Sequence, residues 1–195
     1  MSARAGLLEL LRAASRTPVP WKNGGGLTRE IAIYPLDSDL QSFDWRVSIA
    51  DIRAAGPFSQ FPGVDRQMQV VSGRLSLAVD GGPAVTLTAE SDAVAFSGEV
   101  PVHAEPLGAP VTDLNIMTRR SRCSARLRRK STSEAPVLEL RAHTTLLVAL
   151  NHLVVRREGA ELALGELDAL RIERGPGCTI TARSGPATFY VIEIL

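Results

Sequence analysis

Regular alternation of hydrophobic and polar residues marks the segment 44–50 as a β-strand. The segment reads DWRVSIA, and successive side chains of a strand point to opposite faces. Its apolar side chains therefore share one face, and its polar side chains, among them Arg46 and Ser48, share the other. The segment 27–33 ends close to Pro35, so we predict a second strand there. One face of this sheet is apolar, and the other carries polar chemistry.

A triple glycine, Gly24 to Gly26, comes directly before the second predicted strand. Neither a GxxxxGK[ST] pattern nor a helix follows it, so a phosphate-binding loop is disfavoured. We expect a tight turn that uses positive φ angles, which glycine adopts without steric cost. Asn23 is expected to close this turn.

Short hydrophobic segments separated by turn residues continue along the chain. Segments 66–71, 75–79 and 85–88 are divided by the sequences SG and DGGP. Strands at a spacing of about 8–12 residues with such turns are typical of a β-sandwich or barrel, and the chain is predicted to be all-β. For residues 7–14 two interpretations stay open, a helix or a first strand.

An internal repeat indicates two similar barrels. Residues 71–96 can be aligned with residues 148–172, so that Leu75 falls on Leu153 and Asp92 on Asp168. The continuations GAPVTDLNIM and SGPATFYVIEI also match. Each half is expected to form one barrel, and closing a sheet on itself removes exposed strand edges.

Four spaced motifs carry a resemblance to a known family. They are WKNGGGLTRE, FDWRVSIA, GPFSQFPGVDR and DLNIMTRR. These runs closely resemble the HutD/Ves family of small bacterial proteins, in order along nearly the whole chain. The resemblance implies a bicupin fold, with two cupin-like antiparallel β-barrels of the jelly-roll type in one chain. It also implies a link to histidine utilisation, as a modulator that binds an intermediate such as N-formylglutamate or urocanate. No catalytic mechanism comes with it.

The predicted domain boundary lies between the two copies of the repeat. We expect an N-terminal barrel over residues 1–130, which holds the ligand pocket, and a supporting C-terminal barrel over residues 131–195. The span STSEA, residues 131–135, is the expected flexible boundary.

Polar residues on three predicted strands of the first barrel are the candidate ligand-binding residues. A small barrel buries one side of each strand, so these side chains should converge on a polar cavity if they point inward. The candidates are Thr28, Glu30, Arg46, Ser48, Arg66, Asp113, Asn115 and Met117. Two alternatives stay open: an ion-paired network that sets strand register, and a face that is simply solvated.

Arg46 is the expected anchor for an anionic ligand, and Arg66 is the second. A buried charge without a partner is very costly, so Arg46 should meet Glu30, Asp44, Asp113 or a bound anion. A planar guanidinium also matches a carboxylate with two parallel hydrogen bonds. The sequence therefore predicts a small anionic metabolite as the partner.

The sequence offers little support for metal or nucleophilic catalysis. Cupin metal sites use paired histidines, whereas His103, His143 and His152 form no HxH pair, so we expect no metal and no cofactor. His103 is expected on a strand or turn, with a pocket-lining position as the alternative. Whether the chain is an enzyme is uncertain, and we favour a binder without catalysis. The alternative is a metal-independent isomerase or hydrolase with Glu30 or Asp113 as general base, and a third class is an interaction protein.

Charge and hydropathy exclude two classes of partner. The formal net charge is +1, so no global field attracts nucleic acid or an anionic membrane. The basic cluster over residues 119–130 lacks interleaved aromatic residues and is expected to be a solvated linker or return strand. Glu9 and Arg12 interrupt a possible signal sequence, and Cys123 and Cys178 are expected to be reduced. We expect a cytoplasmic monomer or homodimer.

Overall fold

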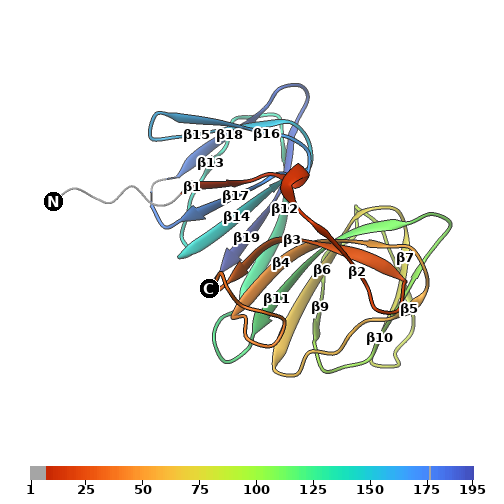
Figure 1. Ribbon diagram of the computed structural model, residues 1–195. Coiled ribbons are helices and arrows are strands. Elements are labelled where there is room, and N and C mark those ends of the chain that lie inside the picture. The colour runs from red at the N-terminus through yellow and green to blue at the C-terminus, as the bar shows by residue number, and fades with distance from the viewer. Residues whose placement is uncertain (1–7, 176) are drawn as a thin grey trace. The chain divides into compact units, whose positions relative to one another are not determined.

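The computed structural model describes residues 8–175 and 177–195, and almost all regular structure in them is β-strand. The chain divides into two compact units. The N-terminal unit contains residues 16–124, and the C-terminal unit contains residues 125–195 together with the described residues before position 16. All pairs of strands run antiparallel (Figure 1). The fold is therefore all-β, as predicted.

The N-terminal unit consists of a six-stranded and a four-stranded sheet. In spatial order, the six-stranded sheet contains β2 (Pro18–Pro20), β3 (Gly26–Tyr34), β4 (Trp45–Ile52), β11 (Val111–Arg119), β6 (Val64–Ser72) and β9 (Val94–Ser97). The four-stranded sheet contains β5 (Gly56–Pro57), β10 (Val102–Pro106), β7 (Leu75–Val79) and β8 (Val85–Leu87). Apolar side chains of the two sheets pack together, with Met68 and Val70 from one sheet against Leu75 and Leu77 from the other.

The C-terminal unit repeats this arrangement. Its five-stranded sheet contains β1 (Leu8–Leu11), β17 (Ala169–Glu173), β14 (Thr144–Ala149), β19 (Ala187–Ile194) and β12 (Ala125–Thr132). Its four-stranded sheet contains β13 (Val137–Leu138), β18 (Cys178–Ala182), β15 (Leu153–Arg157) and β16 (Ala160–Leu164). A short 3₁₀ turn, η1 (Ala13–Ser15), follows β1.

The two units share one strand order. The run β4-β11-β6-β9 corresponds to β12-β19-β14-β17, and β5-β10-β7-β8 corresponds to β13-β18-β15-β16. Leu75 begins β7 and Leu153 begins β15, in agreement with the alignment made on the sequence. The internal repeat is therefore a repeat of structure.

The first described strand does not belong to the unit that follows it in sequence. Leu8–Leu11 forms a strand, not a helix, and pairs with β17 of the C-terminal unit (Figure 1). Arg12 and the amide of Ala13 then bond Asp168, at 2.7 Å each. The predicted division at residues 130 and 131 thus differs from the observed one, because pairing between distant strands decides which unit a segment joins. Residues 1–7 of the predicted first domain lie outside the described residues.

The basic segment is a return strand, one of its two predicted forms. Residues 125–132 form β12 along β19, and Arg128 makes an ion pair with the buried carboxylate of Glu193 at 2.6 Å. Ser131 and Thr132 still belong to this strand. The expected flexible boundary at residues 131–135 is therefore wrong in its first two residues.

The glycine turn has the predicted form. Gly24 has a φ of 70°, and the side-chain oxygen of Asn23 accepts a hydrogen bond from the Gly25 amide at 3.0 Å. At Gly26 an added Cβ would lie 2.4 Å from the backbone oxygen of Asp51, so a side chain is excluded there. The turn thus lets β3 start in close contact with β4.

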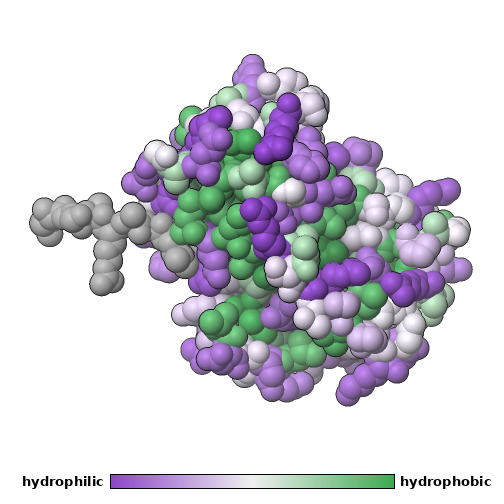
Figure 2. Space-filling model, turned by 45° about the horizontal axis from the view of Figure 1, so that its top comes forward, coloured by the Kyte–Doolittle hydropathy of each residue, from purple (hydrophilic) through white to green (hydrophobic). Residues whose placement is uncertain are grey.

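The surface carries both hydrophilic and hydrophobic residues. On the face seen in Figure 2, hydrophilic residues lie between smaller hydrophobic areas, which is normal because apolar atoms contribute more than half of most protein surfaces. Among the described residues, no helix has the length and hydropathy needed to cross a membrane. Cys123 and Cys178 are both free thiols.

The buried side chain of Arg157 in the C-terminal unit should lower the stability of the protein. The guanidinium nitrogens of Arg157 are buried and have no hydrogen-bond partner among the described residues, and the Glu158 carboxylate lies 3.8 Å from Nε. A buried charge that lacks hydrogen bonds and has only a distant ion-pair partner is costly. Arg157→Met should therefore raise the free energy of unfolding by about 1–3 kcal/mol, measured by urea denaturation.

The matched control is Arg156→Met on the same strand. Arg156 is exposed and bonds Glu161 at 2.7 Å, so its loss should change stability by less than about 1 kcal/mol. A destabilised Arg157→Met variant would show that Arg157 has a partner in solution.

Candidate functional site

All eight predicted site residues lie on one face of the six-stranded sheet. Residues paired across neighbouring strands share a face, and the register aligns them in three rows across β3, β4, β11 and β6. The rows are Thr28, Ala50, Asp113 and Val70; Glu30, Ser48, Asn115 and Met68; and Arg46, Met117 and Arg66. Met68 and Val70 pack against the four-stranded sheet, so this face is the inner one.

The polar residues of this face form a band between two hydrophobic clusters. One cluster contains Ile52 and Val111 and includes residues of the four-stranded sheet. The other contains Ile33, Val64 and Met117. Met117 is thus part of an apolar cluster beside the band. Most of the band is buried, which excludes a simply solvated face.

Arg66 is the most enclosed positive charge in the band. It is 8% exposed, and its Nε and Nη2 atoms donate hydrogen bonds to the side-chain oxygen of Asn115 at 3.2 and 2.9 Å. Its Nη1 atom donates to the carbonyl of Ser59 at 3.4 Å. Burial lowers the pKa of Arg66 to about 10, and nearby Asp113 opposes this effect. The guanidinium therefore remains charged at neutral pH.

Three phenylalanine rings surround the same guanidinium. The Arg66 carbon Cζ lies 5.1 Å from the ring centroid of Phe58, 5.8 Å from that of Phe61 and 5.1 Å from that of Phe96. A cation over an aromatic face is attracted by the ring quadrupole. Phe58 also makes an edge contact with Trp21 at 6.1 Å. The aromatic residues of the GPFSQFPG motif thus hold the second predicted anchor.

Arg46 meets one of its predicted partners. Its Nε donates to Glu30 at 2.7 Å, and the side chains are 13% and 41% exposed. The Arg46–Glu30 pair therefore forms the solvent-accessible edge of the band. Among the remaining candidates, Thr28 accepts a hydrogen bond from the indole nitrogen of Trp21 at 2.8 Å.

Asp113 is the least satisfied member of the band. It is 3% exposed, and its Oδ1 atom has no hydrogen-bond partner among the described residues. Burial raises the pKa of Asp113 to about 7, although the charge of Arg66 acts in the opposite direction. Near neutral pH this carboxyl group is therefore divided between its neutral and ionised forms.

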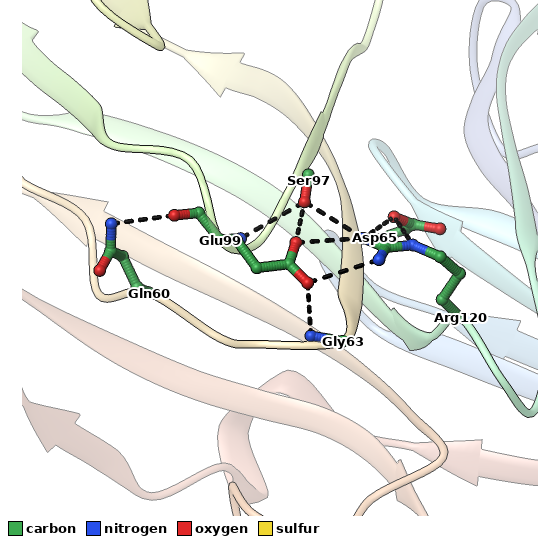
Figure 3. Close-up of polar contacts among 6 residues, drawn as sticks. All are labelled: Gln60, Gly63, Asp65, Ser97, Glu99 and Arg120. Carbon is green, nitrogen blue, oxygen red and sulfur yellow. Dashed lines mark hydrogen bonds and ion pairs between the residues drawn. The ribbon is translucent and has the colours of Figure 1, made fainter.

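A second polar cluster fixes the loop that carries the phenylalanines (Figure 3). Glu99 accepts hydrogen bonds from the Gly63 amide at 2.6 Å and from Arg120 Nη2 at 3.1 Å, and its backbone oxygen accepts one from Gln60 at 2.9 Å. Ser97 also donates to Glu99, and Arg120 pairs with Asp65. Both ends of the segment 60–63 are thus attached to the turn after β9.

Sequence reasoning missed part of this site. The eight candidates follow from strand alternation, but two of the three rings around Arg66, Phe58 and Phe61, come from a loop whose path no alternation predicts. His103 lies exposed on β10, between inward-facing Val102 and Ala104; its alternative position in the pocket is therefore wrong. Among the described residues, no group of three or more histidine, cysteine, aspartate or glutamate side chains is arranged to hold a metal.

Comparison with known proteins agrees with this geometry. The HutD family model matches residues 13–189, which is most of the chain. The chain belongs to the HutD family. An uncharacterised 21.2 kDa protein from the region 3′ of hutC in Pseudomonas putida is 41% identical over 174 residues, which cover 85% of this chain and 87% of that protein. Protein Ves of Cronobacter sakazakii is 40% identical over 55% of this chain and 59% of Ves.

Solved structures show that this HutD family member has a cupin fold. The structure of HutD from Pseudomonas fluorescens SBW25 matches with a TM-score of 0.81 and 30% identity, over 96% of this chain and 98% of that one. A cupin 2 conserved barrel domain protein from Leptotrichia buccalis matches with a TM-score of 0.62 and 9% identity, over 95% and 100% of the two chains. The second match concerns the fold alone. The protein is thus a HutD-type protein with a cupin fold.

Burial of Asp113 generates a pH prediction. A carboxyl group whose pKa rises on folding binds more protons in the folded state, so stability falls as pH rises from about 4 to beyond 7. The loss at pH 8 should be at most ~4 kcal/mol. Asp113→Asn should flatten this dependence, measured by urea denaturation at pH 5 and pH 8. An equal pH dependence of stability in wild type and in Asp113→Asn would show that the pKa of Asp113 does not rise on folding.

The Glu99 cluster generates a prediction about the loop. Bonds from Arg120 and the Gly63 amide lower the pKa of Glu99 to about 2, so the contacts persist over the ordinary pH range. Glu99→Ala should accelerate hydrogen exchange at the Gly63 amide by about tenfold. Glu105→Ala, at an exposed position of β10, is the control and should leave this exchange rate unchanged. Equal rates in wild type and Glu99→Ala would show that Glu99 does not hold the loop.

Proposed function

We propose that this HutD family member binds a small carboxylate at the inner face of its N-terminal unit and thereby modulates histidine utilisation without catalysing a reaction. One observation carries the proposal: Arg46 and Arg66 lie in the same row of this face, one on each side of Met117. Arg46 is close enough to lower the pKa of Arg66, and such repulsion favours an anion between or beside them.

The charges of the face support an anionic ligand. Arg46 and Arg66 contribute two positive charges, and Glu30 compensates one of them through its ion pair. Asp113 is only partly ionised at neutral pH because burial raises its pKa to about 7. An excess of positive charge in a largely buried setting attracts a carboxylate more strongly than the same charge in water.

The choice of ligand rests on the relatives. One relative comes from the region 3′ of hutC, and a solved neighbour is called HutD. These names connect the family with histidine utilisation and support N-formylglutamate or urocanate as candidate ligands. Both candidates carry a carboxylate, which matches a guanidinium anchor. In this proposal, occupancy of the site reports the concentration of such an intermediate.

A second candidate function is a metal-independent reaction on a small acid. Asp113 favours it, because a carboxyl group with a pKa near the working pH suits a general base. Incubation of the protein with N-formylglutamate or urocanate separates the candidates. Binding without conversion supports the modulator, conversion supports the enzyme, and the absence of both supports a protein that acts through other macromolecules.

Arg46→Ala tests the anchor directly. Loss of a charge-assisted contact should weaken binding of N-formylglutamate or urocanate by about 10- to 100-fold, measured by isothermal titration calorimetry. The variant should still unfold cooperatively, because Arg46 and Glu30 meet at the accessible edge of the band. An unchanged dissociation constant would reject Arg46 as the anchor.

Arg29→Ala is the matched control for Arg46→Ala. Arg29 lies on β3 between Thr28 and Glu30, so its side chain points to the opposite face, where it pairs with Asp51 at 2.9 Å. The substitution removes the same charge from a neighbouring strand. Affinity should stay within about twofold of wild type, since Arg29 lies on the opposite face, is paired with Asp51 and is exposed enough for solvent and salt to screen its charge.

A further inference from the structure

We propose that Asp113 selects, among small acids, those that carry an N–H donor, by accepting a hydrogen bond from that group while the guanidinium groups hold the carboxylate. The inference rests on the proposed function and specifies its substrate class. It begins from an asymmetry within the band: both arginines have polar partners, whereas Asp113 Oδ1 has none among the described residues.

The neighbours of Asp113 cannot supply the missing donor. Its partners across the sheet are Ala50 on β4 and Val70 on β6, and neither side chain bears a polar hydrogen. Arg66 is close enough to affect the pKa of Asp113, yet its hydrogen bonds go to Asn115 and to the Ser59 carbonyl. The acceptor and the cation thus lie near each other without pairing.

Such an arrangement suits a ligand with two kinds of group. An unpaired buried acceptor costs free energy, and a ligand that supplies the donor recovers this cost on binding. A site built to hydrogen-bond one group of a ligand also rejects an analogue without that group, because the buried acceptor then stays unpaired. Asp113 therefore discriminates between amide-bearing or imidazole-bearing acids and plain acids.

The equivalent position of the C-terminal unit supports a dedicated role for Asp113. The shared strand order makes β19 the equivalent of β11, and the alignment of GAPVTDLNIM with SGPATFYVIEI then places Phe189 at the position of Asp113. Phe189 is a member of the hydrophobic core of its unit. The fold thus accepts an apolar side chain at this position, and a carboxylate is not required for packing.

A matched pair of acids tests the inference. The probes are N-formylglutamate and its N-methyl derivative, which keeps the formyl group and both carboxylates but lacks the N–H. Wild type should bind the first about 10- to 100-fold more tightly, the range expected for a hydrogen bond to a charged acceptor. In Asp113→Ala this ratio should fall to within about twofold, because the acceptor is gone.

Each outcome of this experiment decides one question. Equal affinity of wild type for both acids overturns the role of Asp113 and leaves the carboxylate site intact. A ratio that persists in Asp113→Ala also overturns it, because the added methyl group then acts sterically. If wild type binds neither acid, the proposed function itself is rejected for N-formylglutamate. Circular dichroism and thermal melting verify that Asp113→Ala is folded.

Proton release provides a readout that a purely structural role would not change. The charged groups that act on Asp113 are Arg66 on β6 and Asp51 on β4, while Val102 and Ala104 of β10 are apolar. A donor bound to Asp113 stabilises its ionised form. The carboxylates of either acid raise the pKa of Asp113, whereas a donated N–H lowers it, so the N–H accounts for the difference between the two acids. At pH 7, binding of N-formylglutamate should release more protons, or take up fewer, than binding of the N-methyl acid, measured by calorimetry in buffers of different ionisation enthalpy. Equal release or uptake of protons with both acids would count against the inference.

Discussion

The burial of the Arg66 guanidinium is the constraint on which the rest of the N-terminal unit depends. A charge placed inside a β-sandwich loses its hydration, and the protein must replace that hydration with hydrogen bonds and polarisable groups. Asn115 on the neighbouring strand supplies an acceptor, and the loop after β5 supplies the Ser59 carbonyl together with two aromatic rings. The loop and the strands are therefore arranged around one cation, and the contacts of Glu99 and Arg120 secure the loop from outside (Figure 3).

The two units share one topology but differ in the chemistry of their interiors. Phe189 and Val191 of β19 belong to an apolar core, whereas the corresponding Asp113 and Asn115 of β11 are polar and buried. An apolar core contributes stability in proportion to its buried area. At these two positions the C-terminal unit is thus apolar, whereas the N-terminal unit carries buried polar groups.

Strand alternation explains why the face of the site could be predicted from sequence. The side-chain period of a strand is two residues, so Arg46 and Ser48 had to share a face, as did Asp113 and Asn115. The sequence did not reveal which strands are neighbours, because β4, β11 and β6 are distant in sequence. The pairing of Leu8–Leu11 with β17 illustrates the limit: it joins segments about 160 residues apart, and no local pattern encodes it. The arrangement of aromatic rings around Arg66 depends on loop conformation, so the sequence could not predict it either, although the GPFSQFPG motif contains two phenylalanines.

One buried oxygen of the band, Asp113 Oδ1, has no hydrogen-bond partner among the described residues, and this favours a ligand-binding site over a purely structural network. A network selected to fix strand register gains most when every buried donor and acceptor is paired. The Arg46–Glu30 pair and the Arg66–Asn115 bonds fit such a network, but Asp113 does not, because its buried oxygen has no partner among the described residues. An apolar residue at that position would cost less, as the C-terminal unit demonstrates with Phe189. An unpaired buried acceptor such as Asp113 lowers the stability of the ligand-free protein. Functional sites are where proteins tolerate such a loss of stability. We therefore propose the band as one half of a set of contacts whose other half is a small, polar acid.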